Sequence, residues 1–384
     1  MTQRWSSKKP IRETLCHPFL MEKKIPDDIL IQIFLRLPRD SLLRCGLASK
    51  AWLRLTSDPF FLRCYRSTRP PMLGFFCNRH PPNTPPRFIP TNKSITKFTF
   101  NIALPLENSC LVGSSRHLLL FGTSNGRSFH VFNLATQEWT AIPQLTGRVS
   151  RRWAIGFVHE SASSTTTPRG FKVIRIGPTL AVQTFSSTVG RWKRSVPEYH
   201  PHDFGTTFKY WPDPSGVAVD DRVLHWFYSE THLLCYDVDT SCFSVVKLPV
   251  ERISHHACLS RSEGRLRYVL FDRRSPRIQT WALRGKSRNQ AWHLEHDMNL
   301  WPLAKGDLVL TNLVLRCYYG GSSFYGSAKM MGLDGSDCNL VFLHAMNGKV
   351  FSCDLQRGEL KHVCDLDFEM VGSMFPFLRY DGWG

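Results

Sequence analysis

A repeat runs through most of this 384-residue chain, and it constrains the fold more than any other feature. Each unit contains a short β-rich run, a gap, and a second run in which a polar turn is followed by an aromatic residue. The first runs lie at 118–123, 171–176, 222–228, 265–271 and 340–345. The aromatic residues after the turns are Trp139, Trp192, Phe243 and Trp292, which are 53, 51 and 49 residues apart. We call these four residues the aromatic anchors.

Repeats of about 50 residues built from short antiparallel strands are typical of β-propellers. A single four-stranded blade cannot bury both faces, whereas blades stacked around an axis bury the faces of their neighbours. We therefore predict an all-β propeller with six blades favoured and seven as the alternative. The aromatic anchors are expected to occupy equivalent positions between blades and to be mostly buried. The period resembles that of kelch repeats, although the chain has one Gly-Gly pair, Gly320-Gly321, where kelch repeats carry one per blade.

A second distinct segment, residues 25–61, is rich in large apolar side chains at helical spacing. Pro26 is suited to open a helix, and Asp27 and Asp28 place negative charge at the positive end of that helix. The apolar positions predict three short helices in fewer than forty residues, with Asp58-Pro59 as the turn after the third. So small a bundle cannot cover all of these side chains alone. Either the rest of the chain or another protein must cover the excess.

The order IP-x-D-I-L-x-x-I-F-x-R-L-P-x-x-S-L-L-R, followed by K-x-W-x-x-L-x-x-D-P-x-F, resembles an F-box over its whole length. An F-box is the helical module that docks on Skp-type adaptors of cullin-RING ubiquitin ligases. Ile25 stands where the family usually has Leu, and Ala48-Ser49 replaces the commoner Val-Cys. The sequences RPPMLGFF and PRFIPT, just behind this segment, resemble the opening of the F-box-associated domain of large plant F-box families.

These observations predict an α+β multidomain chain. We expect a flexible N-terminal lead at 1–23, a three-helix F-box at 24–66, a Pro-containing connector at 67–71, and the propeller at 72–384. The resemblance implies a substrate receptor of an SCF-type cullin-RING ubiquitin ligase, in which the propeller binds the protein to be ubiquitinated. The alternatives are an adaptor-bound scaffold with no role in degradation and a basic propeller that binds nucleic acid.

The resemblance also implies an adaptor-binding surface on the helices. The residues expected to bind the adaptor are Ile25, Pro26, Ile29, Leu30, Ile33, Phe34, Leu37, Pro38, Leu42, Leu43, Leu47 and Trp52. Eight of them are expected to form a largely apolar surface that is accessible in the isolated chain. These eight are Ile25, Pro26, Ile29, Leu30, Ile33, Phe34, Leu42 and Leu43.

The net charge of the chain is +18, and part of it is concentrated in residues 261–288. A basic chain attracts nucleic acid or acidic partners through its long-range field. A solvated basic face is the simplest explanation, an acidic substrate segment is the next, and nucleic acid is the third, so nucleic acid is not the expected partner. If a substrate segment binds here, Arg284, Lys286 and Arg288 in an extended hairpin loop are expected to contact it.

Catalytic signatures are not apparent in this sequence. It has no Walker A loop, no G-x-G-x-x-G after a strand and no G-x-S-x-G elbow. Its twelve cysteines include no C-x-x-C pair and are expected to be reduced. We therefore expect no catalytic, cofactor or metal site and no enzyme activity. No apolar run is long enough to span a membrane and the N-terminus lacks an apolar signal core, so we expect a cytoplasmic or nuclear protein with no membrane partner.

Overall fold

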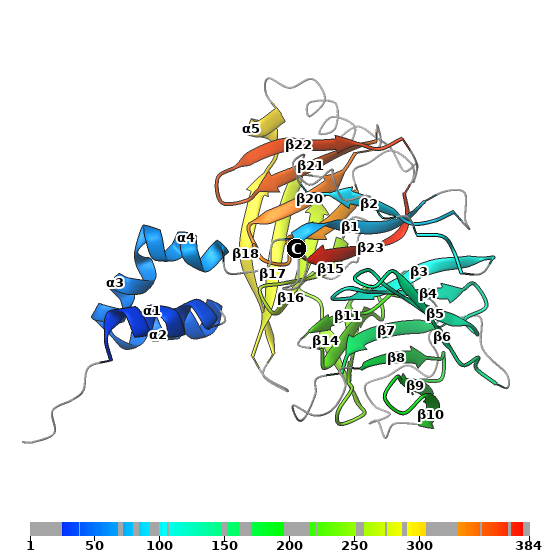
Figure 1. Cartoon of the computed structure of the whole chain (residues 1–384). Coiled ribbons are helices and arrows are strands. Elements are labelled where there is room, and N and C mark those ends of the chain that lie inside the picture. Colours follow the sequence, from blue (N-terminus) through cyan, green and yellow to red (C-terminus); the bar gives the residue numbers. More distant parts are fainter. Residues whose placement is uncertain are drawn as a thin grey trace, which may run out of the picture. The chain divides into compact units, whose positions relative to one another are not determined.

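The chain divides into a helical unit, Met1–Tyr65, and a β unit, Arg66–Gly384 (Figure 1). Each unit is considered by itself below. The residues described by the computed structural model are 25–37, 39–67, 72–79, 84–91, 100, 102–105, 107–146, 153–160, 170–195, 215–219, 221–250, 257–272, 275–285, 290–304, 329–345, 348–367 and 370–378.

Four helices are described in the N-terminal part of the chain: α1 Asp27–Arg36, α2 Arg39–Ala48, α3 Lys50–Ser57 and α4 Pro59–Ser67. As predicted, α1 begins directly after Pro26 and carries Asp27 and Asp28 in its first turn. The two carboxylates lie at the end of the helix where unpaired N–H groups concentrate positive charge.

The fourth helix corrects the prediction of a three-helix module. The sequence Asp58-Pro59 was expected to end the helical segment in a turn, yet it starts α4. The Oδ1 atom of Asp58 accepts hydrogen bonds from the backbone N–H groups of Phe60 at 2.8 Å and Phe61 at 3.0 Å. Pro59 occupies the first helical position, where its missing N–H costs nothing. Asp58 is therefore the N-cap of α4, and Pro59 is its first residue.

A small apolar core holds the helical unit together. Its buried members come from α1, α2 and α4, and they are Leu30, Phe34, Leu42, Phe61 and Tyr65. The Phe34 ring contacts the Trp52 ring edge to face at a centroid distance of 5.5 Å. The hydroxyl of Tyr65 donates a hydrogen bond to the Leu37 carbonyl oxygen at 2.7 Å, which ties the last helix to the end of the first.

The β unit contains twenty-three strands within its described residues, and every pairing between them is antiparallel. A one-turn helix, α5 Trp301–Ala304, follows β18. The strands are β1 Met72–Arg79, β2 Arg87–Pro90, β3 Ser109–Ser115, β4 Leu118–Thr123, β5 Phe129–Asn133, β6 Glu138–Ile142, β7 Ala154–His159, β8 Phe171–Ile176, β9 Val182–Ser186, β10 Arg191–Ser195, β11 Val217–Val219, β12 Val223–Phe227, β13 His232–Asp237, β14 Cys242–Lys247, β15 Ala257–Ser262, β16 Arg265–Asp272, β17 Arg277–Arg284, β18 Ala291–Asn299, β19 Lys329–Leu333, β20 Leu340–His344, β21 Lys349–Asp354, β22 Glu359–Asp365 and β23 Met370–Leu378.

These strands form six sheets, which are the blades of a propeller (Figure 1). Five sheets are four-stranded, and the sixth has the order β2-β1-β23. The innermost strands contact one another in a closed circle, in the order β3, β7, β11, β15, β19, β23 and back to β3. The prediction of six blades is therefore confirmed, and the seven-blade alternative is wrong. The kelch-like detail is not confirmed, and the Gly320-Gly321 pair lies outside the described residues.

The ring is closed by a pairing between the two ends of the β unit. Strand β1 pairs with β23, with Met72 opposite Leu378 and Phe76 opposite Phe375. This sheet therefore contains the first and the last strand of the unit. Because hydrogen bonds and buried side chains join the two ends, no blade is left with an uncovered face at a seam.

The hairpins that lead into the outer strands explain the regular spacing of the repeat. The turn begins with Asn133, Asp237 or Asp354 in three blades, and each of these side chains accepts backbone N–H groups two and three residues later. The residue before the outer strand has a positive φ in four blades. These residues are Gln137, Gly190, Ser241 and Gly358. A shared turn geometry thus produces the constant turn length.

The aromatic anchors are the second residues of the outermost strands β6, β10, β14 and β18. Each pairs with the second-last residue of the neighbouring strand, namely Phe132, Phe185, Tyr236 and Leu283. Their predicted equivalence is therefore correct, but they are half-buried rather than mostly buried. Two indole N–H groups donate to carbonyl oxygens of the preceding blade: Trp192 to Pro143 at 2.6 Å and Trp292 to Lys247 at 2.7 Å. These two rings stay partly exposed because each indole N–H group must reach its carbonyl acceptor on the neighbouring blade.

Candidate protein-binding surfaces

Two exposed isoleucines lie four residues apart on α1, and a third, Ile25, directly precedes the N-cap residue Pro26 of this helix. The exposed fractions are 50% for Ile25, 48% for Ile29 and 43% for Ile33. Residues four apart lie above one another on a helix, so Ile29 and Ile33 share one face of α1. We call these two residues, together with Ile25 before the helix, the exposed stripe. The neighbouring face of the same helix contributes Leu30 and Phe34 to the core of the helical unit. Helix α1 is therefore apolar on two faces, of which the unit covers one.

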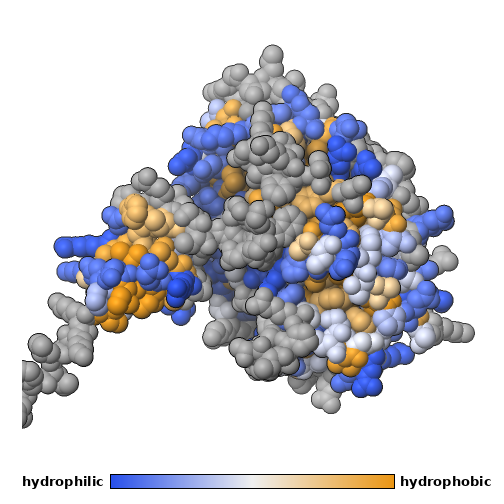
Figure 2. All heavy atoms as spheres, in the orientation of Figure 1, coloured by the Kyte–Doolittle hydropathy of each residue, from blue (hydrophilic) through white to orange (hydrophobic). Residues whose placement is uncertain are grey.

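Three further large apolar side chains of the helical unit are exposed. They are Leu47 at 86%, Leu53 at 50% and Phe60 at 70%, on α2, α3 and α4. Figure 2 shows apolar side chains gathered on the surface of this unit. Exposed apolar area of this kind, rimmed by polar residues, is characteristic of protein interfaces. The sequence prediction missed Leu53 and Phe60, although the amphipathic spacing of α3 and the Asp-Pro cap of α4 were signals for them.

The structure places the predicted adaptor-binding residues in three different environments. Ile25, Pro26, Ile29, Ile33 and Leu47 are exposed, whereas Leu37 and Trp52 are half-buried against the core. Leu30, Phe34 and Leu42 are buried in that core, so the prediction that these three side chains are accessible is wrong. Leu30 and Phe34 follow Ile29 and Ile33 by one residue, so they lie about 100° around α1 from the exposed face. Leu42 lies on α2 and packs in the same core. Pro38 and the side chain of Leu43 lie outside the described residues.

The residues expected to bind an acidic substrate segment are described only in part. Arg284 is exposed, and its guanidinium forms an ion pair with Glu295 at 3.3 Å. Glu295 also pairs with the buried Arg267 at 2.9 Å. Burial raises the pKa of the Glu295 carboxyl, but the charges and hydrogen bonds of Arg267 and Arg284 outweigh burial and lower that pKa below its ordinary value. Arg284 is thus already engaged, while Lys286 and Arg288 lie outside the described residues.

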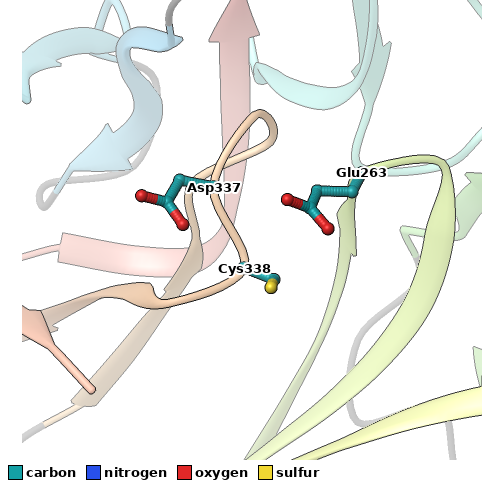
Figure 3. A group of neighbouring side chains, drawn as sticks. All are labelled: Glu263, Asp337 and Cys338. Carbon is teal, nitrogen blue, oxygen red and sulfur yellow. The ribbon is translucent and has the colours of Figure 1, made fainter. Parts of the chain in front are cut away.

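Three potential metal ligands lie together where two blades meet (Figure 3). The ligand atoms of Glu263, Asp337 and Cys338 lie within 4.8 Å of one another. The carboxylate of Glu263 is 3.7 Å from the Arg267 guanidinium, and Asp337 accepts hydrogen bonds from the backbone and side-chain amides of Asn339 at 3.0 Å. Contacts within the protein therefore explain why these carboxylates lie here.

Comparison with known proteins agrees with this architecture. Residues 23–66 match the F-box-like family model, and residues 89–368 match the model described as "F-box protein At3g26010-like, beta-propeller". The F-box protein At5g07610 of Arabidopsis thaliana is 25% identical over 306 residues, which are 72% of this chain and 71% of the relative. The putative F-box protein At3g16210 of the same plant is 23% identical over 251 residues, 60% of this chain and 62% of the relative.

A solved structure of a nidogen/laminin complex contains a chain with 8% identity and a TM-score of 0.43, covering 79% of this chain and 97% of that one. This likeness is too low to add to the assignment. Among the helices that the structure describes, none has the length and apolarity needed to cross a membrane. The propeller model covers well over half of the sequence and the F-box model covers the helices before it. This chain therefore belongs to the family of F-box proteins with an At3g26010-like β-propeller.

Proposed function

We propose that this protein is the substrate receptor of an SCF-type cullin-RING ubiquitin ligase. Its F-box docks on a Skp-type adaptor, and its propeller binds the protein to be ubiquitinated. The observation that carries the proposal is the exposed stripe of Ile25, Ile29 and Ile33, which the helical unit leaves uncovered. Membership of the F-box family supports a Skp-type adaptor as the partner that covers it.

Burial of this stripe gives a reasonable driving force for adaptor binding. Fully burying an isoleucine side chain stabilises by about 1.5–3 kcal/mol. Each of the three isoleucines is roughly half exposed, so docking would gain about 1 kcal/mol from each of them. Leu47, Leu53 and Phe60 offer further apolar surface on the other helices. The buried residues Leu30 and Phe34 contribute by holding α1 in place, not by contact.

The propeller contributes to ubiquitination by positioning. Its six blades form a closed ring, which presents the loops between strands on a rigid scaffold. Holding a target beside the ubiquitin-conjugating subunit raises the effective concentration of its lysines there. In this proposal the chain performs no bond chemistry itself. We place it in the cytoplasm or nucleus, where the ten cysteines described as free would stay reduced.

Adaptor binding by the full-length chain tests the proposal. A variant with Ile29→Asp and Ile33→Asp adds two charges to the centre of the stripe, and it should lose binding to a purified Skp-type adaptor. The control, Thr140→Asp and Gln144→Asp, adds the same charge at two exposed positions of the propeller and should bind like the unchanged protein. Equal binding by all three proteins would refute the assignment of the stripe.

The role in degradation needs a second measurement. Co-precipitation of a cullin with the unchanged protein separates a ligase subunit from an adaptor-bound scaffold. Repeating the precipitation at raised salt separates both from a nucleic-acid-binding propeller, because binding dominated by phosphate contacts falls steeply with salt. We expect the cullin to be retained at 300 mM salt and to be lost with the Ile29→Asp, Ile33→Asp variant.

A further inference from the structure

Four of the five arginines that the structure describes in the basic run at 261–288 form ion pairs with carboxylates of neighbouring strands and turns. These pairs are Arg261 with Asp221, Arg267 with Glu263 and Glu295, Arg277 with Asp297, and Arg284 with Glu295. Cations that are already paired offer little to an acidic partner, so described cations outside these ion pairs are better placed to bind one.

Strand β10 carries such cations. Its sequence, Arg-Trp-Lys-Arg-Ser, places Arg191, Lys193 and Arg194 within four residues, and all three are exposed. No ion pair among the described residues includes any of them. Among the strands that the structure describes, β10 alone carries three cations and no carboxylate.

Within the part of the chain that the structure describes, no strand pairs with the outer edge of β10. It is the outermost strand of its sheet, in the order β10-β9-β8-β7, and β9 is the strand it pairs with in the described part of the chain. An edge strand presents alternate backbone N–H and C=O groups to its open side. Trp192 anchors the strand to the preceding blade by its hydrogen bond to the Pro143 carbonyl oxygen. This hydrogen bond joins the strand to the preceding blade, and the three cations have no ion pair among the described residues.

The side-chain directions define what can bind there. Residues two apart on a strand point to the same face, so Arg191 and Lys193 share one face and Arg194 lies on the other. A strand added to this edge would run about 4.8 Å away and bring its side chains opposite these three cations. Acidic residues at those three positions would complement the charge, and the backbone hydrogen bonds would be independent of sequence.

We propose that the outer edge of β10 binds an extended acidic segment of the target protein by antiparallel strand addition. This inference rests on the proposed substrate-receptor function for the identity of its partner. It adds a second candidate basic contact beside the hairpin loop around Arg284. The competing explanation is that Arg and Lys on an edge strand only prevent unwanted pairing and aggregation. That explanation requires that no extended peptide binds saturably at this edge.

A peptide-binding assay with the full-length protein separates the two explanations. The probe is a fluorescein-labelled peptide, Ser-Thr-Glu-Glu-Val-Glu-Thr-Ser, whose three glutamates match the three cations in antiparallel register. Its affinity is measured by fluorescence anisotropy at two salt concentrations. A second copy of the probe is N-methylated at alternate backbone nitrogens, so that it cannot donate hydrogen bonds to the edge.

The test variant carries Arg191→Glu, Lys193→Glu and Arg194→Glu. The matched control carries Arg87→Glu, Arg127→Glu and Lys247→Glu, which reverses three exposed cations that have no ion pair among the described residues and changes the net charge equally. If the charge reversal lowers the melting temperature, an Arg191→Gln, Lys193→Gln, Arg194→Gln variant takes its place. It removes the three positive charges without adding negative ones.

We expect the test variant to bind the probe at least about tenfold more weakly, and the control to stay within about threefold of the unchanged protein. The N-methylated probe should bind the unchanged protein weaker by a similar factor. A probe with lysines in place of glutamates should bind the test variant. Equal weakening by test and control variants, undiminished binding of the N-methylated probe, or absence of saturable binding would each overturn the proposal. The assay contains no adaptor, so failure of adaptor binding would not be confused with its outcome.

Discussion

Truncation of Phe76 should show how strongly the closing sheet holds the propeller together. Phe76 lies in β1, is fully buried, and its ring centroid is 5.1 Å from that of Phe88, 5.2 Å from Phe100 and 5.6 Å from Phe377. Replacing a core phenylalanine with alanine costs about 3–5 kcal/mol, and each aromatic pair adds about 0.5–1.5 kcal/mol beyond buried area. The measured cost of truncation already includes such pairs, so the three pairs of Phe76 place Phe76→Ala near the upper end of that range, at about 5 kcal/mol.

A loss of that size is a large part of the total stability of a typical domain, which is about 5–15 kcal/mol. Urea unfolding followed by tryptophan fluorescence is a suitable assay, because nine of the eleven tryptophans lie in the β unit. Phe76→Leu keeps most of the buried volume and should cost roughly 1–2 kcal/mol. Phe60→Ala makes the same truncation as Phe76→Ala at an exposed site and should stay within about 0.5 kcal/mol. A cost below about 2 kcal/mol for Phe76→Ala would refute our description of the closing sheet.

Two further substitutions test buried polar groups of the propeller. Tyr268→Phe should be neutral or stabilise by up to about 1 kcal/mol in the same urea assay. The reason is that the buried Tyr268 hydroxyl has no hydrogen-bond partner among the described residues. A cost above about 1 kcal/mol would show that the hydroxyl does have a partner. Burial lowers the pKa of His225 from 6.5 to about 4 in the folded state. The unfolded chain therefore takes up a proton first, so the stability that His225 contributes is complete above pH 6.5 and is lost as the pH falls to 4, by about 3 kcal/mol at most. His225→Gln should make the free energy of unfolding less dependent on pH between 6.5 and 4. An unchanged dependence would contradict the lowered pKa of His225.

The propeller was predictable from sequence because its signal is local and repeated. The turn from Asn133 to Trp139 recurs in other blades with the same length, and side-chain caps and positive φ values impose that length. The pairing of β1 with β23 left no comparable signal. Met72 and Leu378 are far apart in sequence, and nothing near either residue specifies the other.

The candidate sites were predicted less completely, and for different physical reasons. The spacing of apolar residues identifies α1 as a helix, but it cannot tell which apolar stripe the other helices cover. Leu30 and Ile29 look equivalent in sequence, yet one is buried and the other half exposed. The charge of a basic run is visible in sequence, whereas the ion pairs that its arginines form depend on strand register. Arg284 meets Glu295 only because β17 pairs with β18 in the observed alignment.

Turnover of captured proteins most directly tests the claim that one chain links a target to a ligase. Cells expressing the full-length protein, or its Ile29→Asp, Ile33→Asp variant, would be compared with and without proteasome inhibition. Proteins that co-purify with both forms are the candidates for propeller binding. We predict that they carry ubiquitin chains and accumulate on inhibition only with the unchanged protein, while the variant captures them unmodified. Equal ubiquitination and equal turnover with both forms would contradict the account.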